Sequence, residues 1–223
     1  MKRATGRELM DDPAESIAEL EENLRDIERA NRWLGGIAPV RSAVFSLGAA
    51  SVLDVGCGSA DIPLALVDAA RERGTDLHIT CLDSSAQMLE IAQERADQSS
   101  AIRFLQGNGM ALPFPDRAFD VVTCNLALHH FDPPAAIKLL EELRRVALLT
   151  PIVCDLRRSP IGYAGALVLS RLFTRNRFTR HDAPLSARRA YTPAEARELA
   201  LQAGWRNPTV HNKPFYRMLI LDA

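Results

Sequence analysis

The chain has 223 residues, of which 47% are hydrophobic and 25% are charged, with a formal net charge of −1 at pH 7. This length suits one domain with a sizeable core, and the composition is that of an ordinary globular protein. The near-zero charge provides no basic footprint for phosphates, so we do not expect nucleic acid as a partner.

The four cysteines have no C-x-x-C spacing, and each lies in or beside an apolar run (Cys57, Cys81, Cys124, Cys154). This pattern predicts buried, reduced thiols and no metal site or disulfide framework. The first residues, MKRATGRELMDDP, lack the apolar segment of a signal peptide, and the longest apolar stretch, residues 160–169, is too short to cross a bilayer. We expect a cytoplasmic protein without stable membrane insertion.

Two helices are predicted ahead of the first strand. Residues 13–34 carry apolar side chains at mostly helical spacing among many charges, and a shorter helix is expected over residues 39–47. These helices either cover part of a ligand cleft or simply pack on the sheet. We define residues 1–48 as an N-terminal helical cover.

From Ser51 the pattern alternates between strand and helix. Strands are predicted over residues 52–56, 77–82, 102–106, 119–125 and 146–155, the last interrupted by Pro151, and helices over residues 61–73, 84–98 and 133–145. This alternation predicts an α/β fold in which helices cover both faces of a parallel sheet. Ligands of such sheets bind beyond the carboxyl ends of the strands.

The region after residue 155 is irregular until a capping residue and a proline, Thr192 and Pro193, open a helix that Gly204 ends. Residues 210–211 and 215–221 predict two closing strands. We therefore divide a single domain into a core (51–155), a helical lid over an acceptor pocket (156–191) and a C-terminal helix with hairpin (192–223).

A glycine loop follows the first predicted strand in the stretch SVLDVGCGSAD. Gly56, Cys57 and Gly58 stand where the strand turns into a helix, and glycine there permits close approach of a ligand. The dinucleotide fingerprint G-x-G-x-x-G would need a third glycine where this chain has Asp61, which disfavours a nicotinamide cofactor. Asp54 and Asp61 could instead meet a cationic or amine-bearing ligand; a tight turn of another doubly wound domain is the alternative.

The second strand ends at Asp83, 25 residues after Gly58. A carboxylate in this place can accept both hydroxyl hydrogens of a ribose. The alternative is that Asp83 caps the following helix, although Ser84 or Ser85 could do so. We include Ser84 among the candidate cofactor-binding residues.

Four ordered stretches together resemble class I S-adenosylmethionine (SAM)-dependent methyltransferases. SVLDVGCGSAD resembles their motif I, DSSAQML resembles the segment after the second strand, and QGNGMALPF resembles G-D-A-x-x-L-P-F. NLALHHF resembles the segment after the fourth strand in small-molecule and quinone methyltransferases, including the ubiquinone/menaquinone biosynthesis group. The resemblance covers about residues 51–131 and implies a Rossmann-like, seven-stranded, mostly parallel sheet with an antiparallel C-terminal hairpin.

The same resemblance implies further cofactor-binding residues. Met88 is expected near the adenine, and Asn108 stands where the family has an acid that accepts the adenine amino group. The amide oxygen of Asn108 can still accept that hydrogen bond, whereas an Asn-Gly turn is the structural alternative. Gly109 and Met110 would supply backbone contacts to the ring, and Asn125 ends the fourth strand.

Candidate catalytic residues follow the fourth strand. A neutral histidine could remove the proton of a phenol during methyl transfer, and we prefer His130 over His129. The alternative is that both histidines bind loop carbonyls. His181 lies in an arginine-rich run that is either a solvated surface or part of the lid.

The stretch Asn125-Leu126 lacks the N/D-P-P-Y/F/W signature of many methyltransferases that act on nitrogen, and Asp132-Pro133 is interpreted as a helix cap. We therefore predict O-methylation of a small aromatic, polyketide- or quinone-like acceptor in secondary metabolism or cofactor synthesis. The alternatives are ring C-methylation of a quinone-like acceptor and a non-catalytic SAM-binding regulatory or assembly protein. The second alternative is motivated by Asn108 and by the lack of an unambiguous base. A homodimer is compatible with the sequence.

Overall fold

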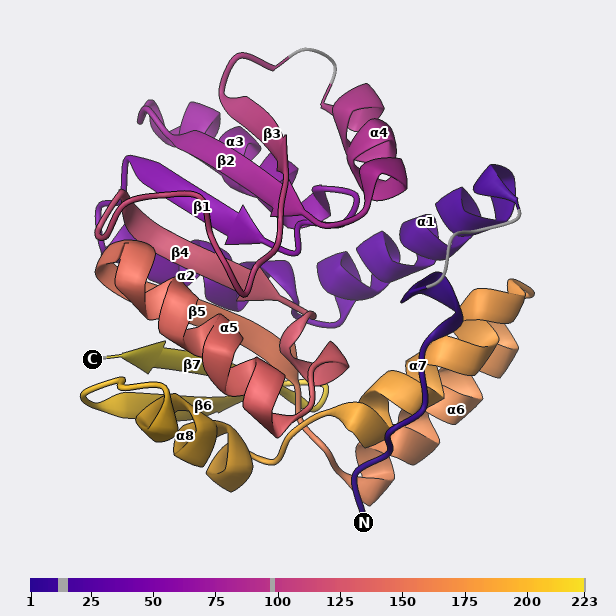
Figure 1. Cartoon of the computed structure of the whole chain (residues 1–223). Coiled ribbons are helices and arrows are strands. Elements are labelled where there is room, and N and C mark those ends of the chain that lie inside the picture. Colours follow the sequence, from indigo (N-terminus) through magenta and orange to yellow (C-terminus); the bar gives the residue numbers. More distant parts are fainter. Residues whose placement is uncertain (12–15, 97–98, 223) are drawn as a thin grey trace.

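The computed structural model describes residues 1–11, 16–96 and 99–222. A seven-stranded sheet has the order β3-β2-β1-β4-β5-β7-β6, in which β7 is antiparallel to both of its neighbours and the other pairings are parallel. The strands are β1 (Ser51–Val55), β2 (His78–Asp83), β3 (Ile102–Gln106), β4 (Phe119–Asn125), β5 (Ala147–Leu156), β6 (Pro208–Lys213) and β7 (Arg217–Asp222) (Figure 1). The predicted doubly wound fold with its antiparallel hairpin is confirmed.

The register of the central strands sets the position of the site. Val55 of β1 pairs with Leu82 of β2 and with Cys124 of β4, so these three strands end at the same edge of the sheet. Val52, Leu53 and Val55 are buried because β1 lies between two strands and under helices on both faces. The residues that follow each strand are therefore neighbours.

Helices cover both faces of the sheet. One apolar cluster joins β1 and β2 to α2 (Ile37–Ser46), α3 (Asp61–Arg73) and α4 (Ala86–Arg95), and a second joins β4 to α5 (Pro133–Val146) and α8 (Pro193–Gln202). Figure 1 shows α5 and α8 in front of the sheet and α2 and α3 behind it. The predicted helices over residues 61–73, 133–145 and from Pro193 onward are confirmed.

Two predicted details are wrong. β5 runs through Pro151 without interruption, because Pro151 stands at the end of the β5–β7 ladder, which begins at Ile152; a missing N–H is least costly there. The region after residue 155 is not irregular, because it forms the expected helical insertion as α6 (Pro160–Phe173) and α7 (Arg177–Arg189).

The helix α1 (Ile17–Trp33) packs between the sheet and the lid region. Its Leu20 and Leu24 form a small apolar cluster with Met88 of α4 and Phe178 of α7. Its first predicted residues, 13–15, lie outside the described part of the chain. On α6, large apolar side chains remain exposed (Ile161, Val168, Leu169, Leu172, Phe173).

The first eleven residues, which we call the N-terminal strap, run along α7 (Figure 1). The strap contains the short helix η1 (Leu9–Asp11), and the backbone N–H groups of Leu9 and Met10 donate to the carboxylate of Asp182. A second short helix, η2 (Leu128–His130), follows β4. Within the described residues, every helix is too short or too polar to span a membrane.

Candidate functional site

The glycine loop is fixed against the end of β2. The N–H groups of Gly56 and Cys57 both donate to the carbonyl of Leu82, at 2.8 and 3.2 Å. Gly56 and Gly58 have φ values of 72° and 53°, which glycine adopts at little cost. A Cβ on Gly56 would lie 3.0 Å from that of Ala127, whereas one on Gly58 would meet nothing within 4 Å. The loop is thus rigid and open at Gly58.

Asp83 lies directly beside this open position. Its Oδ2 accepts the N–H of Gly58 at 2.9 Å, and its Oδ1 accepts the N–H of Ser85 at 3.0 Å. Ser85 is the cap of α4 and accepts the N–H of Met88, so the capping alternative for Asp83 is wrong. Each carboxylate oxygen retains a lone pair for a ribose hydroxyl. Ser84 is exposed next to it.

Asp54 lies behind the loop rather than in front of it. The side chain is 2% exposed, and its Oδ1 accepts hydrogen bonds from Thr123 and, at 2.8 Å, from Asn125. Burial raises the pKa of Asp54 to about 7. We expected Asp54 to contact a ligand directly, but its carboxyl group is buried behind the loop. It positions Asn125 instead. The Oδ1 of Asn125 is buried and accepts no hydrogen bond from the described residues.

Asp61 opens α3 and is reached by the N-terminal helix. Its Oδ2 accepts from Nδ2 of Asn31 at 2.7 Å, and Oδ1 of Asn31 accepts from Arg217 at 2.9 Å. Burial raises the pKa of the Asp61 carboxyl group above its ordinary value. The cover over the glycine loop is thus tied to both α3 and β7. Cys57 is buried, as predicted for the thiols.

Asn108 forms a turn after β3, which is the structural alternative to adenine binding given above. Its Oδ1 accepts the N–H of Met110 at 2.9 Å, and its side chain is exposed. A Cβ on Gly109 would lie 2.8 Å from the side chain of Val55, so packing on β1 requires glycine there. Met88, expected near the adenine, is buried in the cluster with α1 and α7.

His129 is buried and paired with an acid. Its Nδ1 lies 2.6 Å from Oδ1 of Asp155, whose Oδ2 also accepts the backbone N–H of His129 at 3.0 Å. Burial lowers the pKa of His129, but the charge and hydrogen bond of Asp155 outweigh it and the pKa is raised. The pKa of Asp155 is lowered because His129 outweighs the effect of burial. The buried pair with Asp155 holds the His129 ring in one orientation and leaves Nε2 as the ring nitrogen that faces away from Asp155.

His130 is the more accessible of the pair, with a side chain 22% exposed. Its Nδ1 lies 2.8 Å from Oδ1 of Asp11, and its Nε2 lies 3.7 Å from Oε2 of Glu8. Burial opposes ionisation of Asp11, but the hydrogen bond and charge of His130 lower its pKa to about 2. The strap therefore supplies the acids that face this histidine.

Two arginines fix the backbone that carries the histidines. Arg3 donates to the carbonyls of His129 and Phe131 at 3.0 and 2.7 Å, and Arg189 donates to that of His130 at 2.6 Å. The alternative that the histidine rings bind loop carbonyls is wrong, since the rings face carboxylates and the carbonyls of this segment accept from arginines. The strap residues Arg3, Glu8 and Asp11 could not be found from the sequence, because they lie in no motif and far from the histidines in the chain.

His181 lies apart from this pair. Its ring is half exposed, and its Nδ1 lies 2.7 Å from Oδ1 of Asp182, which holds the strap. Among the described residues, the contacts of His181 do not reach His129 or His130. The charged residues between Arg175 and Arg189 fall into two groups. Asp182 and Arg189 are buried, whereas others are exposed (Arg175, Arg177, Arg188).

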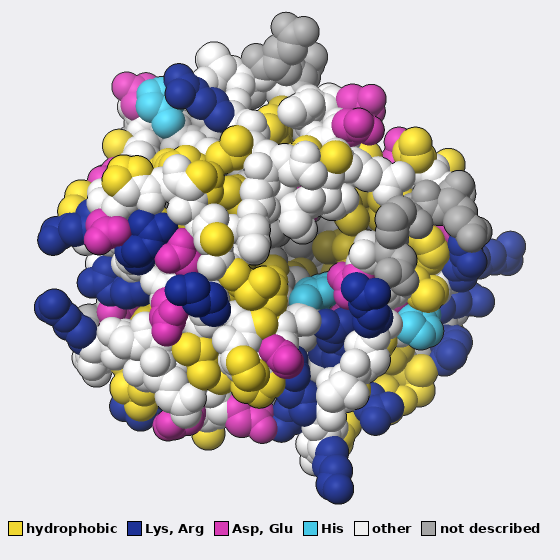
Figure 2. Space-filling view, viewed as in Figure 1, with side chains coloured by type: hydrophobic (Ala, Val, Ile, Leu, Met, Phe, Trp, Pro, Cys, Tyr) yellow, Lys and Arg dark blue, Asp and Glu magenta, His cyan; other side chains and the backbone are white. Residues whose placement is uncertain are grey.

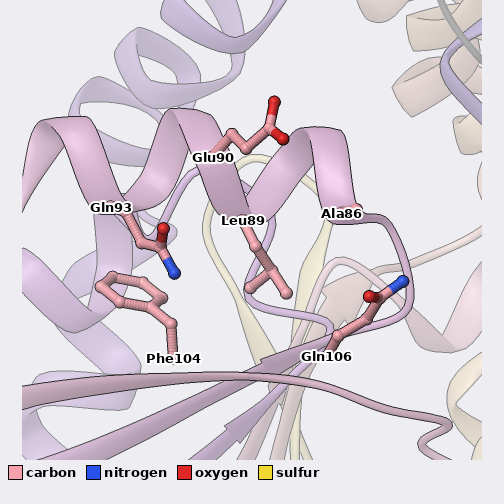
Figure 3. Close-up of a pocket in the computed structure, with 6 residues that line it drawn as sticks. All are labelled: Ala86, Leu89, Glu90, Gln93, Phe104 and Gln106. Carbon is pink, nitrogen blue, oxygen red and sulfur yellow. The ribbon is translucent and has the colours of Figure 1, made fainter.

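The surface has two hollows that bear on where a ligand could bind. Figure 2 shows a hollow on the face beside the carboxyl ends of β1 and β4, with histidine and basic side chains at its border. A separate pocket of about 210 Å³ lies between α4 and β3, lined by residues such as Leu89, Phe104 and Gln106 (Figure 3). None of its lining residues is a predicted cofactor residue, so we do not assign the cofactor to it.

Residues 52–148 match a family model described as a methyltransferase domain. The chain is 43% identical over 97 residues to a demethylmenaquinone methyltransferase of Bacillus licheniformis, covering 44% of this chain and 40% of the relative. It is 35% identical over 121 residues to the corresponding enzyme of Lysinibacillus sphaericus, covering 54% and 50%. The chain thus spans half or less of the length of these curated relatives.

Solved structures share the fold. A SAM-dependent methyltransferase from Aquifex aeolicus superposes with a TM-score of 0.66 at 19% identity, covering 93% of this chain and 98% of that one. Human N-acetylserotonin methyltransferase in complex with SAM superposes with a TM-score of 0.65 at 17% identity, covering 95% and 60%. At these identities the likeness is one of fold.

Proposed function

We propose that this chain, which has the fold and the central domain of class I SAM-dependent methyltransferases, transfers the methyl group of SAM to a small aromatic or quinone-like acceptor. The observation that carries the proposal is the pinned glycine loop, open at Gly58, with the carboxylate of Asp83 beside it. Both features stand at the edge of the sheet where parallel α/β folds bind ligands.

The cofactor is assigned to the ends of β1 to β4. In this assignment Asp83 accepts the ribose hydroxyls, and the backbone around Gly58 approaches the methionine part of SAM. The buried Oδ1 of Asn125 has no donor among residues 1–11, 16–96 and 99–222, and it favours a donor such as the SAM amino group, because an unpaired buried acceptor is costly. Asn108 and the Gly109–Met110 backbone are retained for the adenine, since the Asn108 oxygen has a second lone pair.

The reaction is an in-line displacement at the methyl carbon. The acceptor atom forms a bond to carbon while the carbon–sulfur bond breaks and its electron pair returns to sulfur, which leaves S-adenosylhomocysteine (SAH). Alignment accounts for much of the rate of such a step. For a hydroxyl acceptor, the accessible His130 is the candidate proton acceptor, with His129 holding its segment in place through Asp155.

The methyl acceptor is assigned to segments outside residues 52–148, the part of the chain that matches the methyltransferase family model. We keep residues 156–191 as a lid and residues 1–48 as a cover, because α1 and α7 meet at Leu24 and Phe178. Methylation at oxygen is our first candidate. Ring C-methylation of a quinone-like acceptor is the second, favoured by the name of the curated relatives, demethylmenaquinone methyltransferase.

Calorimetry with SAH tests the cofactor assignment. Asp83→Asn should weaken binding at least about tenfold, which corresponds to about 1.4 kcal/mol, whereas Asp76→Asn, a matched change at an exposed position, should leave it unchanged. A wild-type protein that ignores millimolar SAH would contradict the proposal.

Mass spectrometry on a panel of phenols and quinols then tests turnover. A product methylated at oxygen supports the first candidate, and one methylated at ring carbon supports the second. SAH binding without turnover across the panel would support a non-catalytic SAM-binding protein instead.

A further inference from the structure

Three side chains converge where the N-terminal strap meets η2. Oε1 of Glu8 lies 3.6 Å from Nε2 of His129, and its Oε2 lies 3.7 Å from Nε2 of His130. One donor atom from each of the three lies within 4.8 Å of the others. These N···O separations are too long for hydrogen bonds. They approach the roughly 3.3 Å between two ligands of a tetrahedral ion with bonds of about 2.0–2.1 Å.

Both imidazoles are held in the orientation that metal ligands adopt. Nδ1 of His129 lies 2.6 Å from Asp155, and Nδ1 of His130 lies 2.8 Å from Asp11. A carboxylate on one ring nitrogen fixes the ring, increases the basicity of the other nitrogen and leaves it available to an ion. Both free nitrogens point to the same carboxylate, that of Glu8.

Glu8 provides an independent observation. Its side chain is 2% exposed, and its buried Oε1 receives no hydrogen bond from the described residues. A charged oxygen without a donor in such a place is costly, and a cation would offset that cost. Arg189 approaches it only to 3.6 Å. The carboxylates of Glu8, Asp11 and Asp155 all face the two imidazole rings.

We propose that Glu8, His129 and His130 bind a divalent transition-metal ion of the Zn²⁺ class, with Asp11 and Asp155 orienting the histidines. Two imidazoles and one carboxylate are the donor set of zinc sites that keep a fourth position open. The site is distinct from the SAM site and does not depend on methyl transfer. A bound ion would occupy Nε2 of His130, and this nitrogen could then not take a proton from an acceptor.

Co²⁺ reports on such a site directly. Untagged, metal-stripped protein should bind one equivalent and develop visible d–d absorption, and Zn²⁺ should displace the Co²⁺. Glu8→Gln and His130→Ala should each weaken Co²⁺ binding by at least about 100-fold, and Asp11→Asn by about 10–100-fold, as is usual for a group that orients a ligand. His211→Ala removes an exposed histidine outside the cluster and should bind like the wild type.

Two further measurements separate the site from loss of folding. Zn²⁺ should raise the melting temperature of the wild type and of His211→Ala, but not of Glu8→Gln or His130→Ala, while SAH calorimetry on the same samples reports on the SAM site alone. Equal Co²⁺ affinity in the wild type and both variants would overturn the proposal. So would a thiolate charge-transfer band, which would place the ion on the cysteines, or an absence of binding at millimolar Co²⁺.

Discussion

Asp54, which lies behind the glycine loop, makes the stability of the folded protein depend on pH. Its carboxyl group is buried and receives hydrogen bonds from Thr123 and Asn125, yet burial still raises its pKa to about 7. The folded protein therefore holds a proton on Asp54 that the unfolded chain releases near its ordinary pKa of about 4. The stability from this group is complete below about pH 4 and is lost as the pH rises through about 7.

We expect Asp54→Asn to remove this dependence. Relative to the variant, the free energy of unfolding of the wild type should fall by up to about 4 kcal/mol between pH 4 and pH 8, since each pKa unit is worth about 1.4 kcal/mol. Urea denaturation of both proteins at several pH values measures the difference. A difference that is constant with pH would show that Asp54 ionises normally in the folded protein.

Gly58 allows strain to be separated from ligand contact. Gly58 and Gly74 both have left-handed φ values, 53° and 64°, and a Cβ on either would meet nothing within 4 Å. Gly58→Ala and Gly74→Ala should each lower the stability by about 1–2 kcal/mol. Only Gly58→Ala should also weaken SAH binding, because its new methyl group occupies the side of the loop assigned to SAM. Equal SAH affinity in the two variants would contradict that assignment.

At the scale of elements, the helix after the histidine pair is set by its first residues. Asp132 is the cap of α5 and accepts the N–H of Ala135 at 3.1 Å, with prolines in the first turn, as the sequence predicted. Asp132→Ala should lower the free energy of unfolding by about 1 kcal/mol. Asp76→Ala, at an exposed position, serves as the control. Equal midpoints of denaturation for the two variants would show that the cap contributes nothing.

The core elements could be predicted because their signals are local. An apolar period combined with a capping or turn residue marks each of them. Examples are the strand ends, the start of α5 at Asp132 and the start of α8 at Thr192 and Pro193. A helical insertion was expected after residue 155, but the bounds of α6 and α7 could not be predicted, since α6 exposes apolar side chains such as Phe173, and α7 carries Pro184 inside a charged helix. Tertiary packing overrides these weak local patterns.

The cofactor side of the candidate site could be predicted from the sequence, whereas the contacts of the histidine segment could not. Gly58 and Asp83 follow strands of a parallel sheet, so topology alone brings them together. The histidine side depends on Arg3, Glu8 and Arg189, and contacts between such distant segments leave no trace in a local pattern. Long-range electrostatic partners therefore had to come from the structure.

At the scale of the whole molecule, one cofactor is assigned to elements from both halves of the sheet. SAH at 100 times its dissociation constant should add about 2.7 kcal/mol of stability. For a chain of this size that raises the melting temperature by roughly 5–10 °C. Thermal denaturation followed by circular dichroism measures the shift, and Asp83→Asn at the same SAH concentration should show much less. A wild-type shift no larger than that of Asp83→Asn would contradict the assignment.

The strap carries a consequence for how the protein is made. Arg3 binds the carbonyl of Arg189, 186 residues later in the chain. The ribosome therefore synthesises Arg3 long before the segment that provides its partner carbonyl. Until α7 emerges, those residues remain unsheltered, and the histidine segment that they clamp is among the last parts of the newborn chain to become ordered.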